Sequence, residues 1–79
     1  MKAVAIADLA RLAYRRLSPT LRRQLNRIIW RMASGDYTGV ISWGGGVYSV
    51  TLSTGIFVII EDRPDVVVVQ HIIHPSGGV

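Results

Sequence analysis

The spacing of apolar residues changes near the middle of this chain of 79 residues. Before Gly35 it follows the period of a helix, and after Gly35 it follows the two-residue period of a strand. The clearest helical stripe lies at Leu21, Leu25, Ile28, Ile29 and Met32. Runs at residues 47–52, 56–60 and 66–69 are typical of strands. The pattern therefore predicts helices followed by a sheet.

Two helices are predicted in the first half, with their boundary at Ser18-Pro19. Ser18 can cap the second helix by accepting a hydrogen bond from a free backbone amide. Pro19 suits the first helical position, because the amide hydrogen that proline lacks is not needed there. Gly35 is expected to end this helix in a left-handed conformation.

The first helix is expected to have Asp8 as its N-cap. Its buried face is predicted to comprise Leu9, Leu12, Ala13 and Leu17. In helical phase Val4 would fall among charged residues, so a short strand through Val4 and Ile6 fits better.

The second half is predicted to form an antiparallel meander. In residues 47–52, Tyr48, Val50 and Leu52 share a buried face, and Ser49 belongs to the other, mostly wet face. The acidic segment 61–65 is expected to be a turn, a further strand is expected near residues 40–43, and 44–46 is expected to be a hairpin turn. The fold class is therefore α+β, with a short N-terminal strand and a two-helix hairpin packed on the meander in a single domain, 1–79.

The runs at 56–60 and 66–69 are apolar on both faces, whereas two helices cover only one face of a sheet. The uncovered face of these strands predicts an interface with another protein chain, which includes a second copy of this chain as a candidate partner. The interface residues are predicted to be Ile56, Val58, Ile60, Val67 and Val69.

Charge divides along the same boundary. Residues 1–34 carry eight basic side chains and one acidic, a net +7, and residues 35–79 carry one basic and four acidic, a net −3. A cationic segment joined to an apolar one suggests binding to a polyanion or an acidic partner. The binding residues are predicted to be Arg22, Arg23, Arg27 and Arg31, with Trp30 among them as a stacking surface.

The composition excludes several classes of site. The chain has no cysteine, so it has neither a disulfide framework nor a thiolate metal site. The longest apolar run is 56–60, too short to cross a membrane, and the N-terminus lacks a secretory apolar core. We therefore expect a cytoplasmic protein that does not contact a membrane.

His71 and His74 are the candidates for proton transfer. If one strand holds both, they face opposite sides of the sheet and cannot share a metal, so no metal site and no cofactor are expected. A structural histidine at the strand end is the alternative. The glycines at 44–46 lead into a strand rather than a helix, which argues against a phosphate loop.

The order of a short strand, two helices and antiparallel strands resembles the RelE/ParE superfamily of small toxins from type II toxin–antitoxin pairs. The matching stretches are residues 9–25 with the Ser18-Pro19 break, 32–37 (M-A-S-G-D-Y), 46–52 (G-V-Y-S-V-T-L) and 55–74. The resemblance covers nearly the whole chain. It implies a RelE-like fold, a cognate antitoxin-like partner, and RNA, the ribosome or DNA gyrase as the target.

The resemblance also implies catalytic residues. Tyr48 stands where a family strand carries its aromatic residue, and His74 stands where the terminal motif carries histidine or lysine. An active member would be a ribosome-dependent mRNA endoribonuclease.

This chain departs from the family at its arginines. Thr51 or Leu52 stands in place of one, Ile56 and Phe57 replace the tyrosine and arginine of the next strand, and Pro75 replaces the last arginine. Losing these cations removes stabilisation of the transition state. Two functional hypotheses therefore remain open. One is a toxin-like protein that is catalytically degenerate. The other is a non-enzymatic small viral or plasmid-borne protein that binds nucleic acid through its helices and self-associates through its sheet.

Overall fold

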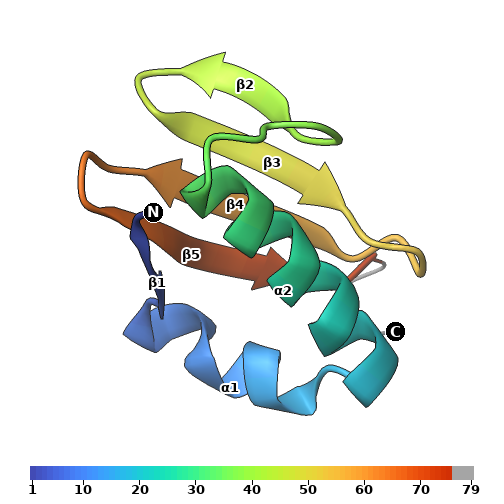
Figure 1. Cartoon of the computed structure of the whole chain (residues 1–79). Helices are drawn as coiled ribbons and strands as arrows, with labels where there is room; N and C mark the ends of the chain where they lie inside the picture. Colours follow the sequence, from blue (N-terminus) through green and yellow to red (C-terminus); the bar gives the residue numbers. More distant parts are fainter. Residues whose placement is uncertain (76–79) are drawn as a thin grey trace.

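The computed structural model describes residues 1–75. β1 (Ala3–Ile6) leads into α1 (Asp8–Arg16) and α2 (Pro19–Ala33). Four strands follow, β2 (Ile41–Gly44), β3 (Val47–Thr51), β4 (Phe57–Asp62) and β5 (Val66–Ile73). Both helices lie on one face of a five-stranded sheet (Figure 1). The predicted α+β class and the order of the elements are confirmed.

The strands lie in the order β1-β5-β4-β3-β2. The meander from β2 to β5 is antiparallel, as predicted. β1 adds a parallel strand beside β5, with Val4 opposite Val67 and Ile6 opposite Val69, so the sheet is mixed. The two halves of the sequence are joined through this parallel pair, which local patterns do not reveal.

The boundaries of α2 follow the predicted signals. The Ser18 hydroxyl accepts a hydrogen bond from the Leu21 amide at 3.2 Å, and Pro19 is the first helical residue. The helix is followed by Gly35 at a φ of 89°, where the absence of a side chain removes the steric cost of a left-handed turn. The predicted apolar stripe is confirmed, since Leu25, Ile29 and Met32 are buried and the other two members are partly buried against the core.

The prediction for α1 was right for two residues and wrong for the others. Leu17 is 3% exposed and Ala13 packs against the core, as expected, but the N-cap and the two leucines within the helix were misplaced. Ala7 is the N-cap and makes no side-chain cap, whereas Asp8 is the first helical residue and pairs with Arg11 at 3.0 Å. Leu9 is 86% exposed, and Leu12 also lies in solvent. The buried residue of the helix is Ala10, whose small side chain allows α1 to lie close to β5. In so short a helix, one or two leucines do not determine which face is buried.

The predicted acidic turn is also shorter than expected. Glu61 and Asp62 belong to β4, and the hairpin closes where the Arg63 amide donates to the Val66 carbonyl at 2.9 Å. β5 continues to Ile73 with a bulge opposite Ile59 and Ile60.

The five residues predicted to form a partner interface point toward the helices. Ile56, Val58, Ile60, Val67 and Val69 are at most 5% exposed and belong to the hydrophobic core. That assignment was wrong for this fold, because successive strand residues alternate between faces and these five lie on the covered side. The neighbouring residues of β4 and β5 lie on the uncovered side instead.

Candidate functional site

Three arginines share one side of α2. Arg23, Arg27 and Arg31 follow one another at intervals of four residues, and all three are exposed. Residues four apart lie on the same helical face, about 6 Å apart along the axis. We call these three residues the arginine surface. Trp30 lies one turn from Arg27 on the outward side of the helix and is 48% exposed.

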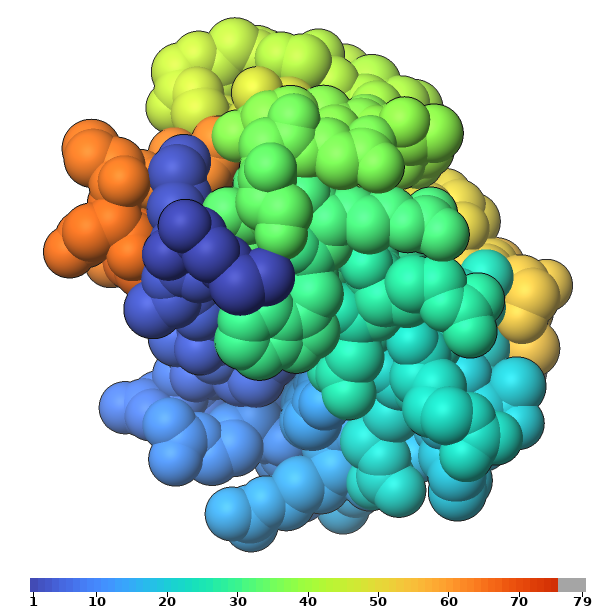
Figure 2. Space-filling model, in the orientation of Figure 1, coloured from blue at the N-terminus to red at the C-terminus, as the bar shows by residue number. Residues whose placement is uncertain are grey.

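A groove runs along the arginine surface. Two hollows of about 300 Å³ each share Gln24 and Arg27 in their linings. One also includes Arg23 and Ser53, and the other includes Arg31 together with residues of the α2–β2 loop and β3. The Ser53 amide donates to the Gln24 side chain at 3.2 Å, which holds the turn after β3 against α2. Figure 2 shows α2 lying open on this side of the molecule, with the turn after β3 at its edge.

The charges of the arginine surface are mostly uncompensated. Within residues 1–75, none of the three arginines forms an ion pair, since the ion pairs join Lys2 to Asp62, Arg11 to Asp8 and Arg63 to Glu61. Solvated guanidinium groups along a groove suit the bidentate binding of phosphate or carboxylate oxygens.

Arg31 differs slightly from the other two because a carboxylate lies near it. The pKa of Asp36 is lowered, first by hydrogen bonds from the hydroxyl and amide of Thr38 and to a smaller extent by the charge of Arg31. Arg23 and Arg27 therefore form the most available part of the surface.

Arg22 lies outside the groove. Its Nη1 donates to the Arg15 carbonyl at 3.1 Å, where the last turn of α1 leaves carbonyl groups without helical partners. Neither hollow is lined by Arg22. Its contact therefore joins the two helices, which is a structural role.

The two predicted catalytic residues are not brought together. Through Ile60 of β4, Tyr48 is level with Val69 near the middle of β5. His74 comes after Ile73, the last residue of β5, and so lies beyond the end of that strand. The Tyr48 ring stacks on Tyr37 on the helix side, with centroids 5.2 Å apart. Each residue remains a separate candidate without a catalytic partner in this arrangement.

A polar cluster that the sequence did not reveal lies beside Tyr48. Asp62 accepts hydrogen bonds from Lys2 Nζ and from the Tyr37 hydroxyl, both at 2.5 Å. Lys2 directly precedes β1, Tyr37 lies in the α2–β2 loop and Asp62 ends β4, so the cluster fastens the start of β1 and the loop to β4. Asp62 follows Val58 and Ile60 on the covered face of β4. An acidic residue at a covered position needs a hydrogen-bonding or charged partner, and this is the one feature of the sequence that could have indicated the cluster.

The cluster perturbs the pKa of each member. Burial alone would raise the pKa of Asp62, but the hydrogen bonds from Lys2 and Tyr37 outweigh burial and lower it. The hydrogen bond to Asp62 raises the pKa values of both Lys2 and Tyr37. All three groups therefore keep their ordinary charges near neutral pH, which favours a structural interpretation over proton transfer.

Other kinds of site find no support in residues 1–75. No group of three or more metal-ligating side chains gathers there, and no helix in that range is long and apolar enough to cross a membrane. His71 and His74 are both exposed.

The chain was compared with known proteins and structures. No family model matches it, and no curated protein sequence matches it. A chain from the solved structure of the intact E. coli RelBE toxin–antitoxin complex superimposes with a TM-score of 0.74 over 96% of this chain and 99% of that chain. The present protein has a RelE-like fold. At 18% identity the likeness concerns the fold alone, and it confirms the architecture that the sequence resemblance implied.

Within this RelE-like fold, the position of Phe57 is informative. The resemblance implies an arginine there, but Phe57 lines an apolar hollow on the sheet face away from the helices. Most cations of this protein lie on the two helices instead.

Proposed function

We propose that this protein is the toxin-like member of a toxin–antitoxin pair and that its arginine surface binds the phosphate backbone of RNA. The groove with three unpaired arginines is the observation that carries the binding role. The RelE-like fold supports the toxin-like role, since the similar solved structure is a toxin–antitoxin complex. An RNA target also implies a cytoplasmic location.

In the proposed interaction, successive phosphates lie along α2 and Trp30 offers a face for an unstacked base. Phosphate contacts of this kind position a nucleic acid without reading its sequence. Single-stranded RNA fits better than a duplex, because only unstacked bases can reach an aromatic side chain.

Binding rather than cleavage is the activity that we propose. Cleavage requires a positioned base and cations around the phosphorane, and Tyr48 and His74 lie apart in the sheet. The polar side chains that line the groove are arginines, an amide and hydroxyls, none of which serves as a general base near neutral pH. In this proposal the protein is catalytically degenerate, which means that it binds RNA without cleaving it.

An antitoxin-like partner would regulate the same surface. The guanidinium groups that bind phosphate also bind carboxylates. We therefore propose that an acidic segment of the partner covers the α2 groove and excludes RNA from it.

Binding of labelled single-stranded RNA over a series of salt concentrations tests the proposal. For a single strand, the slope of log K against log salt changes by about 0.7 for each phosphate contact. Replacing Arg23, Arg27 and Arg31 by alanine should reduce the slope by about 2. The matched control replaces Arg11, Arg15 and Arg16 of α1, which removes the same formal charge outside the groove.

The control variant should retain most of the slope. Equal losses in the two variants would show that net charge, and not the groove, governs binding. A flat slope for the unmodified protein would contradict RNA binding altogether.

The second candidate function is a non-enzymatic nucleic-acid-binding protein that assembles through its sheet, which the apolar hollow at Phe57 favours. Expression in bacteria separates the two. A toxin-like protein should slow growth unless the antitoxin-like protein is present, whereas an assembling binding protein should not respond to such a partner.

A further inference from the structure

The sheet face away from the helices is largely apolar, and both helices of residues 1–75 lie on the other face. Strand register and the lining of a hollow place many apolar side chains there, and we call six of them the open face: Ile41, Trp43, Val47, Phe57, Ile59 and Ile73. Two polar residues, Thr51 and His71, lie on the same side, opposite Phe57 and Ile59. An antiparallel sheet with one face in water normally alternates apolar and polar residues. Here β4 presents Phe57 and Ile59 to that side, which is typical of a face that another layer covers.

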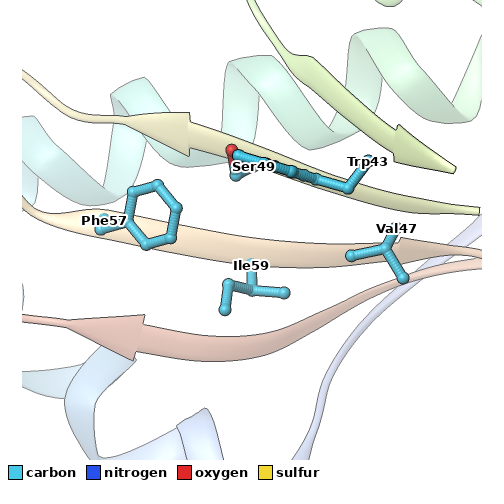
Figure 3. Close-up of a pocket in the computed structure, with 5 residues that line it drawn as sticks. All are labelled: Trp43, Val47, Ser49, Phe57 and Ile59. Carbon is cyan, nitrogen blue, oxygen red and sulfur yellow. The ribbon is translucent and has the colours of Figure 1, made fainter.

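The open face contains a hollow of about 310 Å³ (Figure 3). In Figure 3 the Trp43 indole extends from β2 toward Ser49, and Ile59 and Phe57 of β4 lie beside it. Ser49 had been predicted on a wet face, but it is buried because Trp43 lies over it and donates from Nε1 to its hydroxyl at 2.8 Å. This hydrogen bond satisfies the polar atoms of both side chains, so an apolar partner would leave neither unpaired.

Protruding side chains stand beside the hollow on the same face. Ile41 is 59% exposed, and Ile73 is 48% exposed. One surface therefore supplies both a hollow and the side chains to fill it, which is what a two-fold symmetric contact between identical chains requires.

The charges restrict which partner can approach. On the open-face side, Glu61 pairs with Arg63 at 2.7 Å and accepts from Gln70 at 2.8 Å, so this acid is compensated within the chain. Residues 1–34, which include both helices, carry a net +7. In a two-fold contact the same surface of both copies meets, so a contact through the helices would bring two cationic layers together, whereas a contact through the open faces keeps both cationic layers on the outside.

From the apolar lining, the adjoining hollow and protrusions, and the segregation of charge, we propose that a second copy of this chain covers the open face. The two sheets pack face to face, and the helices form the two outer layers. Each copy then directs its arginine surface outward.

The size of the face indicates the strength of the contact. Strands lie about 4.8 Å apart and rise about 3.3 Å per residue, so the five-stranded sheet outlines roughly 20 Å by 20 Å. This outline of roughly 400 Å² is smaller than the roughly 600 Å² per partner that the smallest standard interfaces bury, which corresponds to a weak contact. The dimer should therefore dissociate on dilution.

Sedimentation velocity over a wide range of protein concentrations tests the proposal without any nucleic acid. The mass should rise from the monomer value of 8.7 kDa toward twice that value. Ile73→Arg should weaken the dimer by at least about tenfold, because it places a charge in the apolar contact. Leu12→Arg is the matched control, since Leu12 is 56% exposed on α1 and the substitution adds the same charge to an aliphatic position.

Circular dichroism checks that each variant is folded, and Trp43→Arg, at a residue 66% exposed, provides a second test of the face if Ile73→Arg does not fold. An unmodified protein that remains a monomer at every concentration overturns the proposal. Equal weakening by Ile73→Arg and Leu12→Arg also overturns it. Because the assay contains no RNA, its failure leaves the proposed function of the arginine surface unaffected.

Discussion

The helix side and the open sheet side of this protein differ in chemistry, although a single core supports both. The outward side of α2 carries three arginines at helical spacing and a groove lined by polar and apolar residues. The open face carries aromatic and aliphatic residues around an apolar hollow. Surfaces so different suit different partners, with an anion on one side and an apolar surface on the other.

The comparison also shows how the strands serve two environments. In β4, Ile60 is fully buried beneath the helices, whereas the adjacent Ile59 lines the hollow on the open face. Neighbouring residues of one strand thus belong to two surfaces because their side chains alternate. Each substitution below tests one side of this division.

The largest effect is expected from truncating the covered side of β4. Ile60→Ala should lower the free energy of unfolding by about 2–5 kcal/mol, because it opens a cavity in a fully buried site. Ile59→Ala is its neighbour and control, and should cost about 1 kcal/mol in the monomer because that side chain is already partly hydrated. Urea unfolding at low protein concentration measures both. Equal costs would contradict the assignment of the two residues to different faces.

An intermediate effect is expected at the polar cluster on the edge of the sheet. Asp62→Asn removes the charge that binds Lys2 and Tyr37 and should cost about 1–3 kcal/mol at neutral pH. The folded-state pKa of Asp62 lies below the reference value of 3.8, so its contribution is present above pH 3.8 and is lost as the pH falls through the folded-state pKa. Unfolding followed from neutral to acidic pH should therefore show a smaller decline for the variant. If the variant lost as much stability at acidic pH as the unmodified protein does, the loss would be due to other carboxylates.

The smallest effect on stability is expected at the arginine surface. Replacing Arg23, Arg27 and Arg31 by alanine should change the free energy of unfolding by no more than about 0.5 kcal/mol, since these exposed side chains form no ion pairs within residues 1–75. The substitution also reduces repulsion among like charges on one helix face. Thermal unfolding of the triple variant measures the change. A large loss would mean that the arginines stabilise the fold and would weaken their assignment to a ligand.

The parts of the fold that depend on local chemistry could be predicted from the sequence. Ser18, Pro19 and Gly35 set the boundaries of α2 through interactions within a few residues, and the long stripe through Leu25 and Ile29 fixed its orientation. The alternation in β3 placed Val50 on the covered face correctly, but it did not reveal that Trp43 buries Ser49 on the other face.

The predictions of which face is covered failed where both faces of an element carry apolar residues. In the segment from Phe57 to Ile60 every residue is apolar, so the pattern carries no information about which face is covered, and the predicted interface was displaced by one residue. Leu9 and Leu12 misled in the same way, since a short helix with leucine on one side and alanine on the other can be buried on either. The contact of Lys2 with Asp62 joins residues 60 positions apart, and no local pattern reports such a contact.

The candidate site also combines a local feature, which could be predicted, with tertiary contacts, which could not. The helical spacing of Arg23, Arg27 and Arg31 could be read from the sequence, because it depends on one helix. The groove beside them requires the turn at Ser53 to approach Gln24, and that contact depends on the tertiary fold. The separation of Tyr48 from His74 likewise depends on strand register.

Sedimentation velocity with labelled RNA, applied to the two surface variants in parallel, tests most directly whether the two sides act independently. The triple arginine variant should still form dimers but should no longer carry RNA, and Ile73→Arg should carry RNA as a monomer. If each variant lost both properties, or if removing the arginines abolished only dimer formation, the division of the molecule into an anion-binding side and an apolar side would be contradicted.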